Sequence, residues 1–309
     1  MNDPAPRSAT SWLMNRPYLL LTLSALFWAG NVVLGRFIAA DFPPMALSFL
    51  RWALACLIVL PIAWPHLKAE WPVIRRHLPI LTLLTLTGLA GYNAIAYLGL
   101  RYTEALNALL IQSSGPLIVA LWSLVLLGIR LTWPQTIGIG ISLLGVLTIL
   151  TRGDPAALAS IHLNKGDLIF TTALIVFALY SVLAVKRPAI HPLAFMAFTS
   201  GYAAVLLIPA VIAEAASGLT PSLSVNNVLT LAYVATFPSI FAYLFFNRGV
   251  ELIGANRAAP FFHLIPVFGS VLAIAFLGER PHLFHVAGYA LVLTGVAIAA
   301  RRTSAVAEA

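Results

Sequence analysis

The chain repeats part of its own sequence at a constant shift of 150 positions, with no gap over about fifty residues. The shift pairs Pro116 with Pro266 and Gly145 with Gly295, and such pairs matter most because proline and glycine set the shape of the backbone. Each proline lies near the middle of an apolar stretch that is long enough to cross a bilayer once. A proline inside a helix removes a backbone hydrogen bond and kinks the chain, so the sequence predicts two interrupted helices at corresponding places, as at a transporter's binding site.

Apolar runs account for most of the chain, since 61% of its 309 residues are hydrophobic and only 9% are charged. A soluble domain carries roughly a quarter charged residues, and a membrane-spanning helix needs about 20 mostly apolar ones. The sequence therefore predicts an all-α integral membrane protein with a single membrane domain. A first repeat is expected over residues 1–151 and a second over 166–300. The ten predicted spanning helices are residues 18–39, 44–64, 78–100, 104–127, 133–151, 166–187, 192–213, 226–249, 256–277 and 282–300.

Lysine and arginine predict the orientation, because the cytoplasmic loops of membrane proteins carry an excess of both. With the N-terminus inside, twelve of the eighteen basic residues fall on the cytoplasmic side and five fall outside, while Arg51 lies within residues 44–64. Both termini are therefore predicted to face the cytoplasm. Because each repeat has an odd number of helices, five, the second repeat must enter the membrane from the opposite side. The ten transmembrane helices are thus predicted to form two inverted five-helix repeats.

Three short motifs make the sequence similar to a known family. They are Trp28–Asn31 (Trp-Ala-Gly-Asn), Leu50-Arg51-Trp52 and Gly278-Glu279-Arg280. Together with the two repeats they resemble the EamA family of the drug/metabolite transporter (DMT) superfamily over nearly the whole chain. This resemblance implies a bacterial inner-membrane exporter of amino acids and other small metabolites. The first half has Gly128-Ile129-Arg130 in place of the acidic motif, which argues that the motif is a structural feature of a helix end.

Two pairs of polar residues occupy matching positions in the two halves. Asn93 and Tyr97 are four residues apart and therefore share a helix face, and the shift of 150 places them on Tyr243 and Asn247. The same two residue types thus occupy the same two sites in exchanged order. One interpretation is that they form two walls of a central water-filled cavity. The other is that they form hydrogen bonds between helices, which asparagine does readily in membranes.

The residues before the two prolines are further candidates for substrate binding. Pro116, a predicted hinge like Pro266, leaves the carbonyl of Gln112 without its helical donor, so this carbonyl and the Gln112 amide could hold an ammonium or a hydroxyl group. Ser113 is a candidate as well, while one of the two serines at positions 113 and 114 is expected to bond back onto its own helix. His263 could shuttle protons or bind a carboxylate, or it could instead be satisfied by a neighbouring helix.

Two other helices complete the predicted substrate site. Trp28 and Asn31 lie in the helix 18–39, and its counterpart in the second half contributes Tyr180. Aromatic rings at this depth are most often plain packing, and that alternative stays open for Trp28 and Tyr180. Arg51 is interpreted as a shallow, structural residue that snorkels to the outer surface or pairs with a neighbour.

Paired glycines predict the packing of the last helix in each repeat. Gly138 and Gly145 are seven residues apart, as are Gly288 and Gly295, so each pair lines one helix face. Small residues permit close approach of two helix backbones. We therefore expect the helices 133–151 and 282–300 to be packing elements outside the transport path, with a homodimer contact as a second role.

The sequence lacks the signatures of an enzyme or of a nucleotide-driven pump. The ten acidic residues all lie in predicted loops or at helix ends, so none forms an acid/base or metal-binding pair at helical spacing. It contains neither a Gly-x-x-x-x-Gly-Lys loop nor a converging Ser/His/Asp set. We therefore predict no catalytic residue, no cofactor and no metal, with an intramembrane lipid-modifying enzyme as the less favoured alternative. The net charge of +8 is explained by basic loops and does not indicate a nucleic-acid partner.

The distribution of charge narrows the expected substrate. Cationic-drug exporters of the same superfamily rely on a membrane-embedded glutamate, which the helix 18–39 lacks. Nucleotide sugars need buried cations for their phosphates, and Arg51 is the one candidate, interpreted as shallow. The predicted cavity suits neutral amino acids, above all aromatic or bulky apolar ones, in a secondary transporter that works by alternating access. Sugars, nucleosides and cationic compounds stay open as alternatives, and proton coupling would depend on His263.

Overall fold

The computed structural model describes residues 12–38, 42–103, 108, 111–160, 164–222, 224–277 and 282–300. Throughout these residues the regular structure is helical. The first half contains α2 (Pro17–Phe37), α3 (Pro44–Arg76), α4 (Leu78–Thr85), η1 (Leu86–Ala90), α5 (Gly91–Tyr102), α7 (Gly115–Leu127), α8 (Trp133–Leu150) and η2 (Pro155–Ser160). The second half contains α9 (Lys165–Leu183), η3 (Ala184–Lys186), α10 (Pro192–Ala216), α11 (Val225–Thr236), η4 (Phe237–Phe241), α12 (Ala242–Ile253), α13 (Ala255–Ala258), η5 (Ala259–His263), α14 (Leu264–Leu277) and α15 (Leu283–Ala300).

Eight helical stretches of the described chain are long and apolar enough to cross a membrane. They correspond to eight of the ten predicted runs and define a multi-pass membrane protein. The run 104–127 contains α7, which is apolar but shorter, and the run 256–277 is divided among α13, η5 and α14. The predicted acidic motif at positions 278–280 lies outside the described residues.

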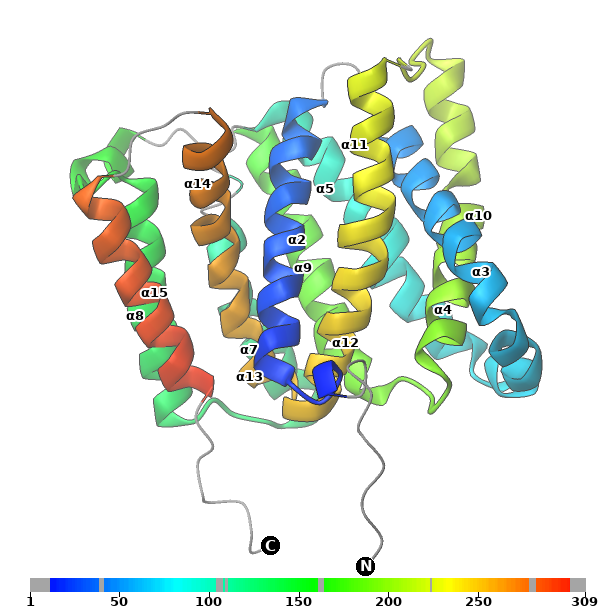
Figure 1. Cartoon of the computed structure of the whole chain (residues 1–309), viewed down its shortest axis with the longest axis horizontal. Coiled ribbons are helices and arrows are strands. Elements are labelled where there is room, and N and C mark those ends of the chain that lie inside the picture. The colour runs from blue at the N-terminus through cyan, green and yellow to red at the C-terminus, as the bar shows by residue number, and fades with distance from the viewer. Residues whose placement is uncertain are drawn as a thin grey trace, which may run out of the picture.

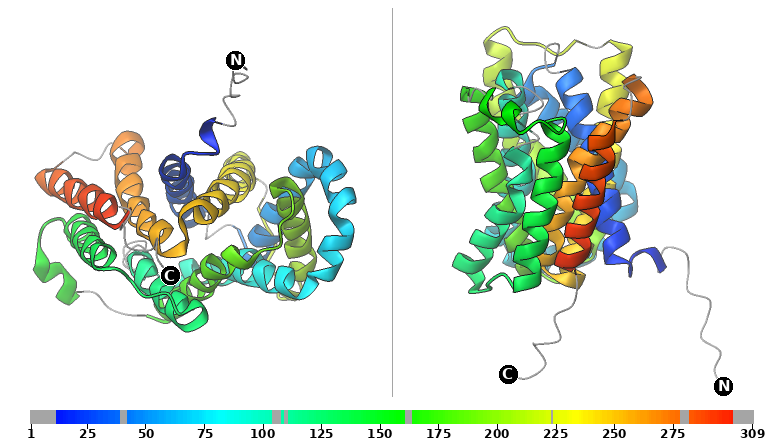
Figure 2. Two further views of the ribbon diagram at one scale, coloured as in Figure 1. Left: turned by 90° about the horizontal axis from the view of Figure 1, so that it is seen from below. Right: turned by 90° about the vertical axis from the view of Figure 1, so that its left-hand side faces the viewer.

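The helices pack in pairs that join the two halves of the chain. Figures 1 and 2 show α8 with α15 at one end of the molecule and α3 with α10 at the other. Between them, α5 packs on α9 and α2 packs on α12. The third helix of the first half thus meets the first helix of the second half, and the first helix of the first half meets the third helix of the second half. The packing therefore follows an approximate two-fold relation between the halves.

The outer pair α3 and α10 is antiparallel and is joined at both ends by glutamates. The carboxylate of Glu214, near the end of α10, accepts hydrogen bonds from the amides of Met45 (3.2 Å) and Ala46 (2.8 Å) at the start of α3. Glu70, near the end of α3, accepts from the amide of His191 at 2.9 and 2.8 Å, directly before α10. The first amides of a helix have no partner within it and favour negative charge, so each helix caps the other.

The other end pair, α8 and α15, is held together by the predicted glycines. A Cβ atom added to Gly138 would lie 2.5 Å from the carbonyl oxygen of Gly295, and one added to Gly145 would lie 2.7 Å from that of Gly288. Both pairs therefore bring backbone against backbone, as small residues in membrane helices allow. The two glycine faces meet within one chain, so a homodimer contact through α8 and α15 stays a prediction and would use their other faces.

Two long spans contain a π-helical turn in their middle, and the two turns occupy corresponding places. The span Leu78–Tyr102 contains η1, and the span Val225–Ile253 contains η4. Such turns are rare and often mark functional sites. The sequence analysis did not predict either of them.

Two helix ends bear on the expectations for the chain. Gly128 ends α7 in the left-handed conformation at φ 69°, which favours glycine, and its amide donates to the carbonyl of Leu124. The first copy of the motif is thus a helix end, as expected. At the other edge, the hydroxyl of Tyr18 in α2 donates to the carbonyl of Ala300 in α15 at 3.0 Å. The first span therefore starts, and the last span ends, on the same side of the molecule (Figure 1).

Candidate functional site

The π-helical turns meet side chains from other helices at the centre of the molecule. The indole nitrogen of Trp28 in α2 donates to the carbonyl of Pro238 in η4 at 3.2 Å. From the other side, the hydroxyl of Tyr243 in α12 donates to the carbonyl of Gly88 in η1. Buried carbonyls need hydrogen-bond partners. Here each half of the chain supplies a donor to the π-helical turn of the other half. The two irregular turns are therefore tied to their surroundings by hydrogen bonds.

An aromatic cluster surrounds Trp28. Its ring centroid lies 5.6 Å from Phe177, 5.7 Å from Tyr243, 5.2 Å from Phe246 and 6.0 Å from Phe262. These rings come from α9, α12 and η5, so the cluster joins both halves at the centre. Trp28 is nevertheless only partly buried, so part of this residue stays accessible. We call these five side chains the aromatic cluster.

A second group of side chains surrounds Arg51 of α3, which is only 1% exposed. Its Nε donates to the hydroxyl of Ser239 at 2.8 Å. Its Nη1 donates to Oδ1 of Asn93 at 2.7 Å, to the hydroxyl of Tyr97 at 2.7 Å and to Oδ1 of Asn31 at 3.3 Å. Every one of these acceptors is neutral. We call these five residues the arginine cluster, and it draws on α2, α3, α5 and η4.

The burial of Arg51 corrects the interpretation of this residue as shallow. Ser239, which its guanidinium reaches, lies at the midpoint of the 29-residue span Val225–Ile253. Counting turns along α3 located the backbone of Arg51 but not the end of its long side chain, which extends inward from the helix. A charged side chain at membrane depth is costly, so a residue of this kind is by default a candidate for function.

Each half contains the same hydrogen bond with its residue types exchanged. In the first half, the hydroxyl of Tyr97 in α5 donates to Oδ1 of Asn31 in α2 at 2.7 Å. In the second half, the hydroxyl of Tyr180 in α9 donates to Oδ1 of Asn247 in α12 at 2.6 Å. The first and third helices of each half are therefore linked by one tyrosine–asparagine bond. All four residues were predicted as site residues, but their pairing was not predicted.

The residues predicted around the two prolines are engaged by protein groups. Nε2 of His263 donates to the carbonyl of Ser113 at 2.7 Å, and its Nδ1 lies 2.5 Å from the hydroxyl of Ser142 in α8. A carbonyl only accepts, so Nε2 must carry a proton. His263 is fully buried, so in this conformation it links three helices. Gln112 is also buried, with its side chain beside the hydroxyl of Tyr92.

The helix that contains Pro116 is interrupted directly before this proline. The amide and the hydroxyl of Ser114 both donate to the carbonyl of Ile111, at 3.0 and 2.6 Å, and α7 begins one residue later. Ser114 therefore bonds back onto its own segment. In the second half, Pro266 follows the 3₁₀ helix η5 near the start of α14. Both predicted hinges thus lie just after an interruption of the regular α-helix, a turn at Ser114 in the first half and η5 in the second.

The structure brings the predicted site residues into three groups. The first group is Asn31, Asn93 and Tyr97, which lie at Arg51. The second is Trp28 and Tyr243 in the aromatic cluster, with Tyr180 and Asn247 beside it. The third is Gln112, Ser113 and His263, which lie at the broken helices. Four of them, those on α5 and α12, were predicted to face one water-filled cavity. In this conformation their exposed fractions are small: Asn93 3%, Tyr97 4%, Tyr243 1% and Asn247 5%.

Sequence reasoning missed the central place of Arg51 and the part played by Ser239. Leu50-Arg51-Trp52 had been noted as a motif, and the reach of an arginine side chain could have suggested a deeper position. Ser239 follows Pro238 in an apolar span, and a serine beside a proline is a signal of local backbone irregularity. Without a structure, however, neither residue could be assigned to the other.

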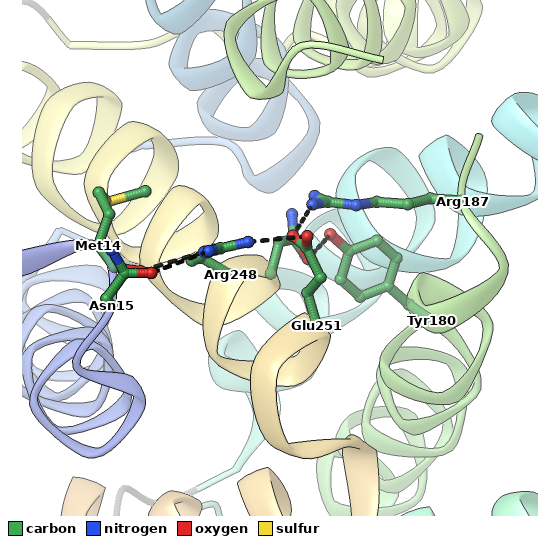
Figure 3. A network of polar contacts seen from close by, with 7 residues as sticks. Met14, Asn15, Tyr180, Arg187, Arg248 and Glu251 are labelled. Atoms are coloured by element: carbon green, nitrogen blue, oxygen red, sulfur yellow. Dashed lines mark hydrogen bonds and ion pairs between the residues drawn. The ribbon is translucent and has the colours of Figure 1, made fainter. Parts of the chain in front are cut away.

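Charged residues form a further network, separate from the bond between Tyr180 and Asn247, and link three segments of the chain. Figure 3 shows Glu251 of α12 between two arginines, with Oε2 2.6 Å from Arg187 and Oε1 2.8 Å from Arg248. Arg248 also donates to the carbonyl of Met14 at 3.1 Å and to Oδ1 of Asn15 at 3.2 Å. This network ties the residues before α2 to α12 and to the segment after α9.

An apolar groove of about 410 Å³ shares no lining residue with either cluster. It lies among α2, η5, α14 and α15, and few polar groups line it, so it lacks the converging polar groups of a metabolite site. The central clusters are the better candidate. The lining residues are Tyr18, Thr22, Phe261, Leu264, Leu293, Val296, Ala297 and Ala300.

Eight candidate spans, two matching halves and a polar centre shared between them define the class as a multi-pass membrane protein built on an internal repeat. The EamA-like transporter family matches the chain twice, over residues 15–151 and 164–301. The chain belongs to this family, which is part of the drug/metabolite transporter superfamily. The family resemblance seen in the sequence is therefore confirmed.

Several proteins named as transporters, exporters or efflux pumps resemble most of the chain. It is 29% identical to the uncharacterized transporter YyaM of Bacillus subtilis (strain 168), covering 90% of this chain and 92% of that one. It is 26% identical to a protein of Streptantibioticus cattleyicolor named "probable terminal-alkyne amino-acid exporter", over 92% and 93% of the two chains. It is 27% identical to the "probable amino-acid metabolite efflux pump" of Salmonella typhimurium, over 90% and 93%.

One protein of known crystal structure has the same fold. The match has a TM-score of 0.70 and covers 91% of this chain and 96% of the other, at 19% sequence identity. The family and the named relatives are transporters, which places this chain among transporters.

Proposed function

We propose that this protein is a secondary transporter that exports neutral amino acids, above all aromatic or bulky apolar ones, and related small metabolites. The observation that carries the proposal is the aromatic cluster around Trp28, which adjoins polar side chains at two π-helical turns in the centre of the molecule. Aromatic rings bind apolar side chains, while a few fixed polar groups orient a ligand. Two relatives named as exporters of amino acids or their metabolites support the same substrate class.

The proposed mechanism is alternating access within a scaffold of ten helices in two inverted repeats. Support comes from the antiparallel pairs α3–α10 and α8–α15, since each pair joins corresponding helices of the two halves. In inverted repeats the substrate site lies at the interface between the halves, near the middle of the membrane. The network around Glu251 joins segments at one edge of the molecule, and in this proposal it holds that edge closed.

We further propose a bacterial inner-membrane location with both termini in the cytoplasm. The excess of basic residues on that side supports the orientation, and the contact of Tyr18 with Ala300 supports an even number of crossings. A reporter that works only in the cytoplasm should be active when it is fused after the last helix, and one that works only in the periplasm should be inactive there. The opposite result, activity of the periplasmic reporter alone, would contradict the orientation or the helix count.

Transport in proteoliposomes tests the substrate class. Purified protein reconstituted in vesicles loaded with labelled L-phenylalanine or L-leucine should release either one down its gradient without ATP, and protein-free vesicles are the control. Labelled sugars, nucleosides and a cationic dye form the comparison set. Movement of one of these compounds, with no movement of any neutral amino acid, would replace the proposed substrate class.

A further inference from the structure

We propose that Arg51 is the anion-binding residue of this transporter and that it binds the carboxylate of the transported molecule. This inference rests on the proposed function and narrows it, because it makes a free carboxylate the group that the protein selects. The sequence analysis favoured a cavity without charge. The geometry instead points to a site in which one fixed positive charge faces the substrate.

The charge of Arg51 is not compensated within the part of the chain that the structure describes. Its four hydrogen-bond acceptors, on Ser239, Asn93, Tyr97 and Asn31, are hydroxyl and amide oxygens. The ion pairs of the described residues all involve Glu251 and lie elsewhere. A single charge buried in a low-dielectric interior attracts an opposite charge far more strongly than it would in water.

The guanidinium keeps a donor for a ligand. Nε and Nη1 have acceptors, whereas no described residue accepts a hydrogen bond from Nη2. Nη2 can therefore donate a charge-assisted hydrogen bond to a carboxylate, and a second, parallel bond would require the carboxylate to displace an acceptor from Nε or Nη1. The neutral acceptors hold the guanidinium in place, so a carboxylate would meet an oriented donor and not a mobile side chain.

The rings next to Arg51 supply the other half of the recognition. The guanidinium carbon lies 4.9 Å from the ring centroid of Trp52, whose ring lies 5.2 Å from Tyr243. Tyr243 in turn lies 5.7 Å from Trp28 of the aromatic cluster. A fixed cation therefore adjoins a continuous row of packed aromatic rings, which begins with the buried Trp52 and Tyr243 and ends at the partly buried Trp28. This arrangement fits a molecule with a carboxylate at one end and an apolar or aromatic group at the other.

The same chemistry favours a carboxylate over a phosphate. Both anions bind arginine, but a phosphate carries up to two negative charges and is usually bound by several cations. Arg51 is the one cationic side chain in the arginine cluster. Phenyl phosphate is therefore a useful comparison compound, and we expect it to bind more weakly than a carboxylate of the same size.

The experiment compares carboxylates with ligands in which an amide or a phosphate takes the place of the carboxylate. Thermal unfolding of the purified full-length protein is measured with L-phenylalanine, 3-phenylpropionate, L-phenylalaninamide and phenyl phosphate, and with the corresponding leucine series. The two carboxylates of each series should bind at least about tenfold more tightly than the amide, since a hydrogen bond to a charged group contributes this much discrimination. In Arg51→Gln this preference should fall below about threefold, and Arg51→Lys should keep part of it.

Arg75→Gln is the matched control, because Arg75 lies exposed at the end of the same helix and should leave the preference unchanged. If Arg51→Gln does not fold, the wild-type preference and the Arg51→Lys variant still decide. Equal binding of acid and amide, or no binding of any carboxylate, would overturn the inference. Transport of phenylalanine and its amide at equal rates would refute the inference and leave the proposed function standing. Arg51-dependent binding of carboxylates, without transport of any amino acid, would do the reverse.

Discussion

The two halves of the molecule share one hydrogen bond but differ in charge. Tyr97 with Asn31 in the first half repeats Tyr180 with Asn247 in the second, at nearly equal distances of 2.7 and 2.6 Å. In the first half, Arg51 also bonds to both members of that pair. The corresponding position of α10 holds no charged residue.

This difference in charge can be located by comparing the first turns of α3 and α10. Both helices begin with a proline, Pro44 and Pro192, and the eighth residue is Arg51 in α3 but Thr199 in α10. The hydroxyl of Thr199 donates to the carbonyl of Phe195 in its own helix at 2.7 Å, so it takes no part in the centre. The scaffold is thus two-fold in its packing and its polar links, while the element that we propose to set specificity occurs in one half only.

The largest expected effect is a loss of stability when the close glycine contact between α8 and α15, to which both halves contribute, is disrupted. Gly138→Val would force a side chain against the carbonyl of Gly295, 2.5 Å from the new Cβ, and Gly295→Val would meet Gly138 and Ser142 in the same way. Because rigid backbone cannot move aside, each variant should lose about 3 kcal/mol or more of stability. Yield and melting temperature in detergent provide the measurement. Gly140→Val is the control, since nothing lies within 4 Å of its Cβ position; equal losses in all three variants would show that helix propensity, not packing, is responsible.

The second prediction concerns the charge that only one half carries. Arg51→Met should reduce transport at least about tenfold, since a buried charge bonded to a ligand typically contributes 2 kcal/mol or more. Thr199→Val, at the matching position, should leave transport within about twofold, because the hydroxyl bonds only within its own helix. Initial rates in proteoliposomes at equal protein content compare the two. A comparable loss in both variants would mean that position in the helix, and not charge, matters.

The third prediction separates the two tyrosine–asparagine bonds by stability. Tyr180→Phe leaves Oδ1 of Asn247 without its donor, whereas Tyr97→Phe leaves Oδ1 of Asn31 with Arg51 at 3.3 Å. A buried acceptor without a partner costs about 1–3 kcal/mol, so Tyr180→Phe should be the more destabilised variant. Denaturant unfolding followed by tryptophan fluorescence measures the difference. The opposite order would indicate that Arg51 contributes little to the first pair.

The smallest expected effect is a pH dependence at the start of α10, where the start of α3 has no equivalent. His191 caps α10 by accepting from the amide of Leu193 at 3.2 Å, and its ring stacks on His66 at 3.6 Å. Burial, followed by the neighbouring His66, lowers the pKa of His191 from its usual 6.5, although Glu70 opposes this shift. The unfolded chain therefore binds more protons just below pH 6.5, so stability should fall as the pH falls through that window.

Melting temperatures at pH 7.5 and 5.5 measure this effect. His191→Asn keeps an N-cap acceptor but removes the titrating ring, so its melting temperature should change less between the two pH values than that of the wild type. A variant that loses as much stability as the wild type would assign the pH dependence to other groups.

Several features of the fold could be predicted because they depend on local composition. Runs of about 20 apolar residues can only be helices in a membrane, since every backbone group must be satisfied within the segment. The glycines of α8 and α15 lie at a spacing that requires a shared face, and the structure places those faces against each other. Asn93, Tyr97, Tyr243 and Asn247 were singled out because polar groups at this depth need partners.

By itself, the sequence thus determined the all-helical membrane class, the repeat, the family and the residue types at the centre. Only the tertiary structure decided which polar groups meet, because partners such as Arg51 and Ser239 are 188 residues apart. The π-helical turns also needed the structure, because donors from other helices, such as Trp28 and Tyr243, bond their carbonyls. Such contacts depend on how whole helices pack, and this information is spread over the entire chain, whereas apolar length and glycine spacing can be read within a single segment.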